Sequence, residues 1–326
     1  MLVDMPLDQL RSYTGSSEEP ADFDAFWATT LDEARTLRRD PILEPVAHPF
    51  AHVDIYDVSF SGWGGEPIRG WLRTPKDPSE PVPGIAVCQG YGGGRGFAFE
   101  QLMWAEAGYA ILNIDTRGQG ATWGNGDTPD NGPGAGPQYP GWMTRGIQDP
   151  NKHFYRRLMT DCVLGFEMLR ALPFVDAERV GVTGGSQGGG LSLAVTALAE
   201  GVRASYPLVP FLCDYRRATA ITDEFPFREI SKYIATHRLE EEQVYRTLSY
   251  FDGVNFARRA TAPVKMTAAL MDATVPASTI FAAYNNYAGS TKDIQVWSHN
   301  GHEGGEMYDE FDKFHFFAKH LGGRDF

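Results

Sequence analysis

From residue 83 onward, short apolar runs alternate with segments whose apolar residues recur at helical spacing. Strands that are apolar along their whole length are typical of a parallel sheet covered by helices on both faces. The pattern therefore predicts an α/β fold with a mostly parallel central sheet flanked by helices. The expected strands are 84–88, 109–115, 180–183, 203–209, 264–270 and 294–297, and the expected helices are 97–107, 154–172, 187–200, 276–287 and 306–320.

The pattern before residue 83 predicts an N-terminal extension. Residues 1–20 are rich in Pro, Ser and Glu and are expected to form an extended arm. Apolar residues at helical spacing predict an amphipathic helix over 22–39. Two β-prone runs, 52–60 and 67–74, are joined by a glycine-rich segment and predict a hairpin.

Two segments interrupt the alternation of strands and helices. Residues 118–150 are rich in Gly, Pro, Asn and Trp, and an irregular stretch of that length inside a compact fold is usually functional or mobile. Residues 211–260 are charged and helical, and we expect this insertion to lie over the strand ends as a cap or a contact surface. No repeat or linker composition divides the chain, so we expect one domain over 1–326.

The chain is acidic, with a formal net charge of −13. That charge disfavours nucleic acid and anionic membranes as partners. The N-terminus lacks the basic and apolar regions of a signal peptide, and no apolar run reaches transmembrane length, so we expect a cytoplasmic protein. Cys88, Cys162 and Cys213 are too few and too widely spaced for a disulfide framework or a zinc pattern, and we expect buried thiols, no metal and no cofactor.

The stretch 180–195 places a serine between a strand and a helix. Gly184 to Gly188 carries the pattern G-x-S-x-G around Ser186, and good helix formers follow. In this context the pattern is typical of a nucleophile elbow, a sharp turn that presents the serine hydroxyl to a cleft. Glycines leave room where Cβ atoms would collide. The alternative is a glycine-rich turn with an incidental serine.

A serine nucleophile needs a base, and the base needs a group that orients it. Asp272 follows the strand 264–271, and His302 lies in a turn after the strand 294–297, which gives the order Ser, Asp, His of α/β-hydrolases. Both would lie at the carboxyl edge of the sheet, where open α/β sheets place their sites.

Rival residues exist for both roles. His299 lies in the same turn as His302, but glycines flank His302 and favour it as the base. Asp293 begins a strand rather than ending one, which would place it at the wrong edge. Asp272 itself has an alternative interpretation as a solvated turn aspartate.

The predicted chemistry is ester hydrolysis through an acyl-serine. His302 accepts the proton of Ser186, which attacks an ester carbonyl, while Asp272 fixes the tautomer of the imidazole. Backbone N–H groups of Gln187 and of Tyr91, in the loop after the first apolar strand, are expected to bind the oxyanion.

Motifs along nearly the whole chain match one known family. They are Arg117-Gly118-Gln119, the 184–188 motif and His302-Glu303, with the stretches 20–27, 210–217 and 270–276. On these residues the chain resembles carbohydrate esterase family 7, the acetyl xylan esterases and cephalosporin C deacetylases. The resemblance implies an α/β-hydrolase fold and the triad Ser186, Asp272 and His302. It also carries Tyr91 and Gln187 over as oxyanion-hole residues.

The resemblance further implies the substrates and the assembly. The substrates would be small acetylated sugars, such as acetylated xylo-oligosaccharides, and cephalosporin C, and some members use hydrogen peroxide in place of water. The assembly would be a cytoplasmic homo-hexamer, a dimer of trimers whose active sites open toward an inner cavity. The chain departs from the family at Gln89 and Gly92, where histidine and asparagine are frequent, which bears on the rigidity of the oxyanion loop.

Residues around the predicted site are expected to support it. Arg117 and Gln119 follow the strand 109–115 and are expected to be scaffolding, with an arginine clamp on a substrate carboxylate as the alternative. Glu303 is expected to orient the histidine loop or to pair with an arginine. Aromatic residues that could line a sugar or acyl pocket are Trp123, Tyr139, Trp142 and Phe227.

Two other functions are compatible with the motif. A peptidase of the prolyl oligopeptidase type shares the elbow and the triad order, but the chain has no propeller-like repeat. A non-catalytic α/β-hydrolase-fold binding protein would typically lack a triad residue.

Overall fold

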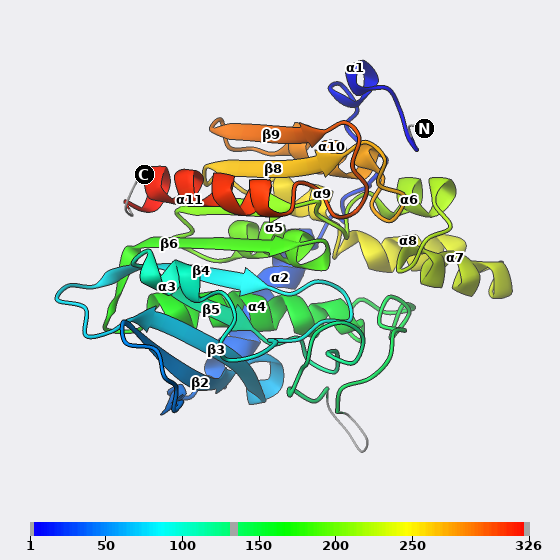
Figure 1. Ribbon diagram of the computed structural model, residues 1–326. Helices are drawn as coiled ribbons and strands as arrows, with labels where there is room; N and C mark the ends of the chain where they lie inside the picture. Colours follow the sequence, from blue (N-terminus) through cyan, green and yellow to red (C-terminus); the bar gives the residue numbers. More distant parts are fainter. Residues whose placement is uncertain (1–2, 131–135, 323–326) are drawn as a thin grey trace.

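One sheet runs through the molecule, and helices cover both of its faces (Figure 1). The computed structural model describes residues 3–130 and 136–322, and in this part of the chain nine strands pair in the order β1-β2-β3-β5-β4-β6-β7-β8-β9. Strands β1, β2, β3 and β5 pair antiparallel, and all later pairings are parallel. The strands are β1 (Ile42–Pro45), β2 (Val53–Ser61), β3 (Pro67–Pro75), β4 (Val82–Cys88), β5 (Ala110–Ile114), β6 (Val175–Gly185), β7 (Ala204–Leu208), β8 (Val264–Ala269) and β9 (Lys292–Trp297).

The helices form two layers around this sheet. Helices α4 and α5 pack on one face of the central strands, and α3 and α11 pack on the other. The prediction of a mostly parallel sheet flanked by helices is confirmed. The helices are α1 (Leu7–Leu10), α2 (Phe23–Thr36), α3 (Leu102–Glu106), α4 (Phe154–Arg170), α5 (Gln187–Leu198), α6 (Tyr215–Ile221), α7 (Phe227–Thr236), α8 (Glu241–Ser249), α9 (Gly253–Ala257), α10 (Ala277–Asn286) and α11 (Met307–Leu321), with a 3-10 turn at Trp63–Gly65.

The central strands are apolar throughout because both faces are buried. In β4, Ala86 and Cys88 belong to the large core that contains α4 and α5. Ile85 and Val87, which alternate with them, belong to a second core beneath α3 and α11. Successive side chains of a strand point to opposite faces, so a strand between two helical layers needs apolar residues at every position.

Helix α3 is shorter than the helix expected over 97–107. Gln101 has a left-handed backbone, with φ of 56°, which prevents the helix from starting earlier. The carbonyl groups of Phe97 and Ala98 accept hydrogen bonds from the buried Arg73 instead of from a helical turn. A hydrogen bond from a residue 24 positions away therefore keeps the backbone at Phe97 out of the helical conformation.

Three further differences concern the edges of elements. The expected extended arm contains α1, and Asn285 donates hydrogen bonds to the carbonyls of Leu10 and Tyr13 that fasten the arm to α10. The short edge strand β1 was not expected. Strand β6 begins at Val175, earlier than predicted, because Asp176, Glu178 and Arg179 interrupt the apolar pattern of its first half.

The charged segment 211–260 folds into α6 to α9. Helices α6, α7 and α8 lie beyond the carboxyl ends of the strands (Figure 1). Phe225, Pro226, Glu229 and Lys232 of this insertion line the large cavity described below. The insertion therefore forms one wall of a space at the carboxyl edge of the sheet.

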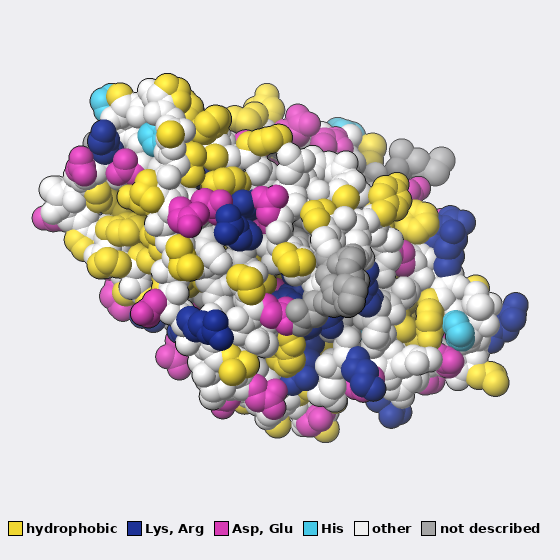
Figure 2. All heavy atoms as spheres, turned by 90° about the horizontal axis from the view of Figure 1, so that it is seen from below, with side chains coloured by type: hydrophobic (Ala, Val, Ile, Leu, Met, Phe, Trp, Pro, Cys, Tyr) yellow, Lys and Arg dark blue, Asp and Glu magenta, His cyan; other side chains and the backbone are white. Residues whose placement is uncertain are grey.

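The surface carries mixed charge. On the face in Figure 2, basic side chains are interspersed with acidic ones rather than gathered into one patch. Among residues 3–130 and 136–322, no helix combines the length and apolar character needed to cross a membrane. Cys88, Cys162 and Cys213 are buried free thiols, as predicted.

Candidate active site

Ser186 lies on the sharp turn between β6 and α5, and its backbone is strained. Its φ of 56° and ψ of −117° are unfavourable for a residue with a side chain. The flanking glycines permit the turn, because a Cβ at Gly184 would lie 2.6 Å and one at Gly188 2.2 Å from the carbonyl oxygen of Cys88. The Ser186 amide donates to the carbonyl of Leu208, which holds the turn against the next strand.

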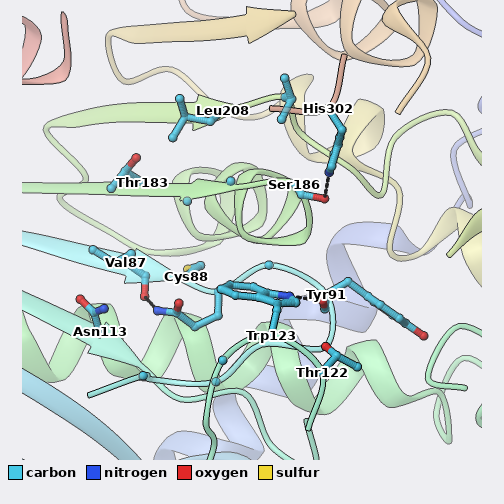
Figure 3. Close-up of a pocket in the computed structure, with 18 of the residues that line it drawn as sticks. Val87, Cys88, Tyr91, Asn113, Thr122, Trp123, Thr183, Ser186, Leu208 and His302 are labelled. Atoms are coloured by element: carbon cyan, nitrogen blue, oxygen red, sulfur yellow. Dashed lines mark hydrogen bonds between the residues drawn. The ribbon is translucent and has the colours of Figure 1, made fainter. Parts of the chain in front are cut away.

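His302 connects Ser186 to Asp272, and Figure 3 shows its contact with Ser186. Its Nε2 lies 3.0 Å from Ser186 Oγ, and its Nδ1 lies 2.8 Å from Asp272 Oδ2. The other carboxylate oxygen of Asp272 accepts hydrogen bonds from the amides of Thr274 and Val275. The buried Asp272 carboxylate is thus fixed by its own turn and presents one oxygen to the imidazole.

The rival residues, Asp293 and His299, are not part of this hydrogen-bonded series. The side chain of Asp293, at the start of β9, is 71% exposed and faces Lys265 at 3.7 Å. His299 is exposed in the same turn as His302. Glu303 Oε1 accepts hydrogen bonds from the Gly301 amide and from the side-chain amide of Asn300, so Glu303 braces the loop that carries His302.

Two backbone amides near Ser186 in the chain or the cavity have no hydrogen-bond partner among the described residues. Among the described residues, neither the Tyr91 nor the Gln187 amide donates a hydrogen bond. Gln187 is the first residue of α5, where amides have no partner within the helix and the helix dipole is positive. These are the two donors that the sequence analysis assigned to the oxyanion.

Segment 120–123 packs on the loop that carries Tyr91. Trp123 Nε1 donates to the Tyr91 carbonyl at 2.7 Å, and Thr122 Oγ1 donates to the Gly92 carbonyl at 2.7 Å. A Cβ at Gly92 would lie 2.2 Å from Thr122 Oγ1, and one at Gly93 would lie 2.3 Å from the Trp123 ring. Gly92, with φ of 78°, therefore belongs to a close contact of two chain segments.

A buried amide network lies behind this loop. Gln119 Oε1 accepts from the Gly92 amide at 2.7 Å, and its Nε2 donates to Gln187 Oε1. Gln187 Nε2 donates to the carbonyl of Gln89, and Tyr155 Oη donates to Gln187 Oε1. The side chain of Gln187 thus ties the start of α5 to the opposite loop. Tyr155 was not expected here, since nothing in its local sequence distinguishes it from other core residues of α4.

Arg117 is buried among carboxylates rather than open to a substrate. It donates to Asp161 and to Glu66 Oε2, the latter at 2.8 Å, and Asp130 lies 3.5 Å away. Burial alone would lower the pKa of Arg117, but the carboxylates of Asp161 and Glu66 hold it above its usual value. The residue anchors the segment 117–119 to α4 and does not line the cavity.

A cavity of about 1280 Å³ opens above Ser186 and His302. It extends across the α3 and α11 face of the sheet to Asn113, Thr183 and Leu208 (Figure 3). Within the described residues, no three His, Cys, Asp or Glu side chains are grouped as a metal site requires.

Two of the four aromatic residues expected in the pocket line this cavity. They are Trp123 and Tyr139, both largely exposed. Trp142 and Phe227 were wrongly placed, because both are fully buried, Trp142 beside Tyr91 and Phe227 against Phe211.

The chain is similar to known acetyl esterases over nearly its whole length. The model of the family described as acetyl xylan esterase (AXE1) matches residues 1–321. The solved acetyl xylan esterase from Paenibacillus sp. R4 is 39% identical with a TM-score of 0.88, covering 97% of this chain and 100% of that one. Acetyl xylan esterase 1 from Thermoanaerobacterium sp. JW/SL YS485 is 34% identical, also with a TM-score of 0.88, covering 97% and 99%.

A curated relative is more distant and longer. Acetyl esterase Axe7A of Xylanibacter ruminicola is 28% identical over 282 residues, which are 85% of this chain and 61% of the relative. The chain therefore spans 61% of the length of that relative. The architecture described above is the α/β-hydrolase fold of the two solved esterases.

Proposed function

The chain belongs to the acetyl xylan esterase family, and on this basis we propose that it is a serine esterase that removes acetyl groups from small acetylated substrates. One observation carries the proposal. A continuous hydrogen-bonded series joins Ser186, His302 and Asp272, and Ser186 and His302 line the cavity, while the amides of Tyr91 and Gln187 donate no hydrogen bond to any described residue. Acyl transfer needs this set of a nucleophile, an oriented base and an oxyanion site.

The reaction proceeds in two halves. His302 Nε2 takes the proton of Ser186 Oγ as the oxygen attacks the acetyl carbonyl carbon, and Asp272 stabilises the imidazolium. The amides of Tyr91 and Gln187 bind the oxyanion. His302 then protonates the leaving alcohol, which departs and leaves acetyl-Ser186. Water attacks the acetyl group with His302 again as base, and acetate is released.

We assign as substrates acetylated xylo-oligosaccharides, other small acetylated sugars and cephalosporin C. The support is the family membership and the lining of the cavity, in which the exposed side chains of Trp123 and Tyr139 occur together with Ser186. A sugar ring can pack on such a face. We also propose a cytoplasmic homo-hexamer, as the resemblance to this family implies.

Substitution of the nucleophile tests the esterase. Wild-type protein is expected to hydrolyse 4-nitrophenyl acetate faster than the octanoate, and Ser186→Ala is expected to lose all but a residual activity, roughly a 10⁵–10⁶-fold drop in kcat. Labelling with a serine-directed phosphonate should occur in the wild type and disappear in the variant. Ser79→Ala, at an exposed serine far along the sequence, is the matched control.

Three outcomes would contradict the proposal. Equal rates on acetate and octanoate would remove the preference for a short acyl group. Cleavage of a proline-containing peptide anilide, without acetyl ester hydrolysis, would support the peptidase of the prolyl oligopeptidase type instead. Absence of labelling would support a non-catalytic binding protein.

A further inference from the structure

The hydroxyl of Tyr91 uses all of its hydrogen-bonding capacity. It donates to Glu229 Oε1 at 2.6 Å and accepts from the amides of Gly141 at 3.3 Å and Trp142 at 3.1 Å. A phenol has one hydrogen and two lone pairs, so no further partner is possible. Burial and the adjacent carboxylate both raise the pKa of Tyr91, which keeps its proton in place.

Glu229 belongs to α7 of the insertion and contacts two loops at once. Its second oxygen, Oε2, accepts from the Met143 amide at 3.1 Å. One carboxylate therefore joins the loop of Tyr91 to the segment 141–143. Burial raises the pKa of Glu229, and the two hydrogen bonds that its carboxylate accepts from Tyr91 and Met143 act in the opposite direction.

Gln119, Thr122 and Trp123 hold the backbone of this loop at Tyr91 and Gly92, but the loop has only one side chain of its own to fix its position. Tyr91 stands between Gly90 and the run Gly92–Gly94, and glycine restricts its backbone least of all residues. Tyr91 is therefore the one side chain in 90–94 through which the position of the loop can be fixed. Its ring packs edge-on against Trp142, with ring centroids 5.1 Å apart.

We propose that Glu229 is a positioning residue of the oxyanion hole, which holds the ring of Tyr91 and thereby the direction of the Tyr91 amide. The inference rests on the proposed function, since it assigns that amide to the oxyanion. Among the described residues, Glu229 makes no hydrogen bond to Ser186 or His302, so it acts through Tyr91. The insertion then contributes to catalysis as well as to the wall of the cavity.

Two substitutions remove the same contact from opposite sides. In Glu229→Gln the amide oxygen can accept from Tyr91 or from Met143, but its NH₂ group then faces the other donor. Tyr91→Phe removes the hydroxyl and keeps the ring. We expect each variant to lower kcat on 4-nitrophenyl acetate about tenfold and to leave KM within about twofold, because an amide that is turned away weakens transition-state binding alone.

A boronic acid provides a readout that a merely structural role would not change. Its tetrahedral adduct with Ser186 places an oxygen in the oxyanion hole, so its inhibition constant should rise with the loss in kcat in both variants. The double variant should lose less than the two single losses combined, since both changes break the contact between Tyr91 and Glu229. Glu242→Gln, at an exposed glutamate of α8 in the same insertion, is the matched control.

The outcomes separate this inference from the proposed function. If the wild type hydrolyses acetate esters and Glu229→Gln retains its kcat and its boronate affinity, the positioning role is wrong. A rise in KM at constant kcat would also overturn it, because Glu229 would then contact the substrate directly. If Glu229→Gln does not fold, the kcat and the boronate affinity of Tyr91→Phe test the positioning role in the same way. A wild type that is neither active nor labelled by phosphonate overturns the proposed function itself.

Discussion

At the scale of single residues, the two carboxylate oxygens of Asp272 have different hydrogen-bond partners. Oδ1 accepts from two turn amides, and Oδ2 faces His302. An amide side chain at this position must therefore place its oxygen toward Thr274 and Val275. Its NH₂ group then faces Nδ1 of His302 and favours the tautomer that has its proton on Nε2.

Asp272→Asn is accordingly expected to lower kcat by roughly 10³–10⁴-fold, since Nε2 could no longer accept the Ser186 proton. The fold should survive, because the new side chain keeps the two turn contacts. The measurement is kcat on 4-nitrophenyl acetate together with the melting temperature. Asp293→Asn, the rival aspartate, is the control; if it caused the larger loss, the assignment of the orienting residue would be reversed.

The sequence predicted Ser186, Asp272 and His302 as neighbours because chain order and strand ends are local information. Glu229 and Tyr155 were missed for a physical reason. Glu229 reaches Tyr91 across 138 positions, and a glutamate on a charged helix looks like any solvated one. Gln187 was expected to act through its backbone, and its side chain proved to tie two loops together.

At the scale of elements, two buried carboxylates hold the N-terminal arm to the insertion. Asp214 accepts from the hydroxyl of Tyr13 and from Ser16, and Asp252 accepts from the Asp214 amide and caps α9 through Val254. Burial, with the charge of Asp214 beside it, raises the pKa of Asp252 from 3.8 to about 7. The N-terminal arm is therefore held to a part of the insertion where burial favours the protonated form of the Asp252 carboxyl group.

This raised pKa makes stability depend on pH. Between 3.8 and about 7 the folded protein holds a proton on Asp252 that the unfolded chain has released, so the contribution of this residue to stability falls as pH rises through that window. We expect Asp252→Asn to remove this part of the decline. The measurement is the free energy of unfolding at about pH 5 and about pH 8. An identical pH dependence in the wild type and the variant would show that Asp252 is ionised throughout.

The sequence predicted an element correctly where the burial of its own residues determines its structure. It predicted the bounds of an element poorly where contacts with distant residues determine them. The apolar strands β4 to β8 carry their signal in their own residues. Helix α3 begins late because Arg73, on a distant strand, binds the carbonyls that a first turn would use. Strand β1 is exposed at the sheet edge and has no alternation that periodicity could reveal.

At the scale of the whole molecule, exposed apolar side chains gather on two packed helices and their flanks. Trp104 of α3 stacks on Phe314 of α11, with ring centroids 3.9 Å apart. Large exposed apolar side chains occur on α3, on α11 and in the segment just before α3, and large exposed apolar patches mark interaction surfaces. These side chains are Phe97, Phe99, Met103, Met307, Tyr308 and Phe311.

We expect this apolar surface to be used in the proposed hexamer. Light scattering should then give a mass about six times the chain mass of 36.0 kDa. Met307→Glu, which puts a charge on a residue 65% exposed, should lower that mass without loss of folded structure. A mass of one chain for the wild type would contradict the assembly, and an unchanged mass for the variant would move the interface elsewhere, for instance to the insertion 211–260.

The contact of Gln187 with the carbonyl of Gln89 has a consequence for engineering. Gln187, whose amide is proposed to bind the oxyanion, also holds through its side chain the loop of Tyr91, whose amide is the other proposed donor, so the two proposed donors are structurally linked. A substitution that enlarges the cavity by moving either the loop of Tyr91 or the start of α5 would therefore displace both amides. Libraries that seek new substrates should therefore leave 89–94 and 187 unchanged and vary the far lining of the cavity, at positions such as Tyr139, Phe225 and Lys232, where side chains are tied to neither donor.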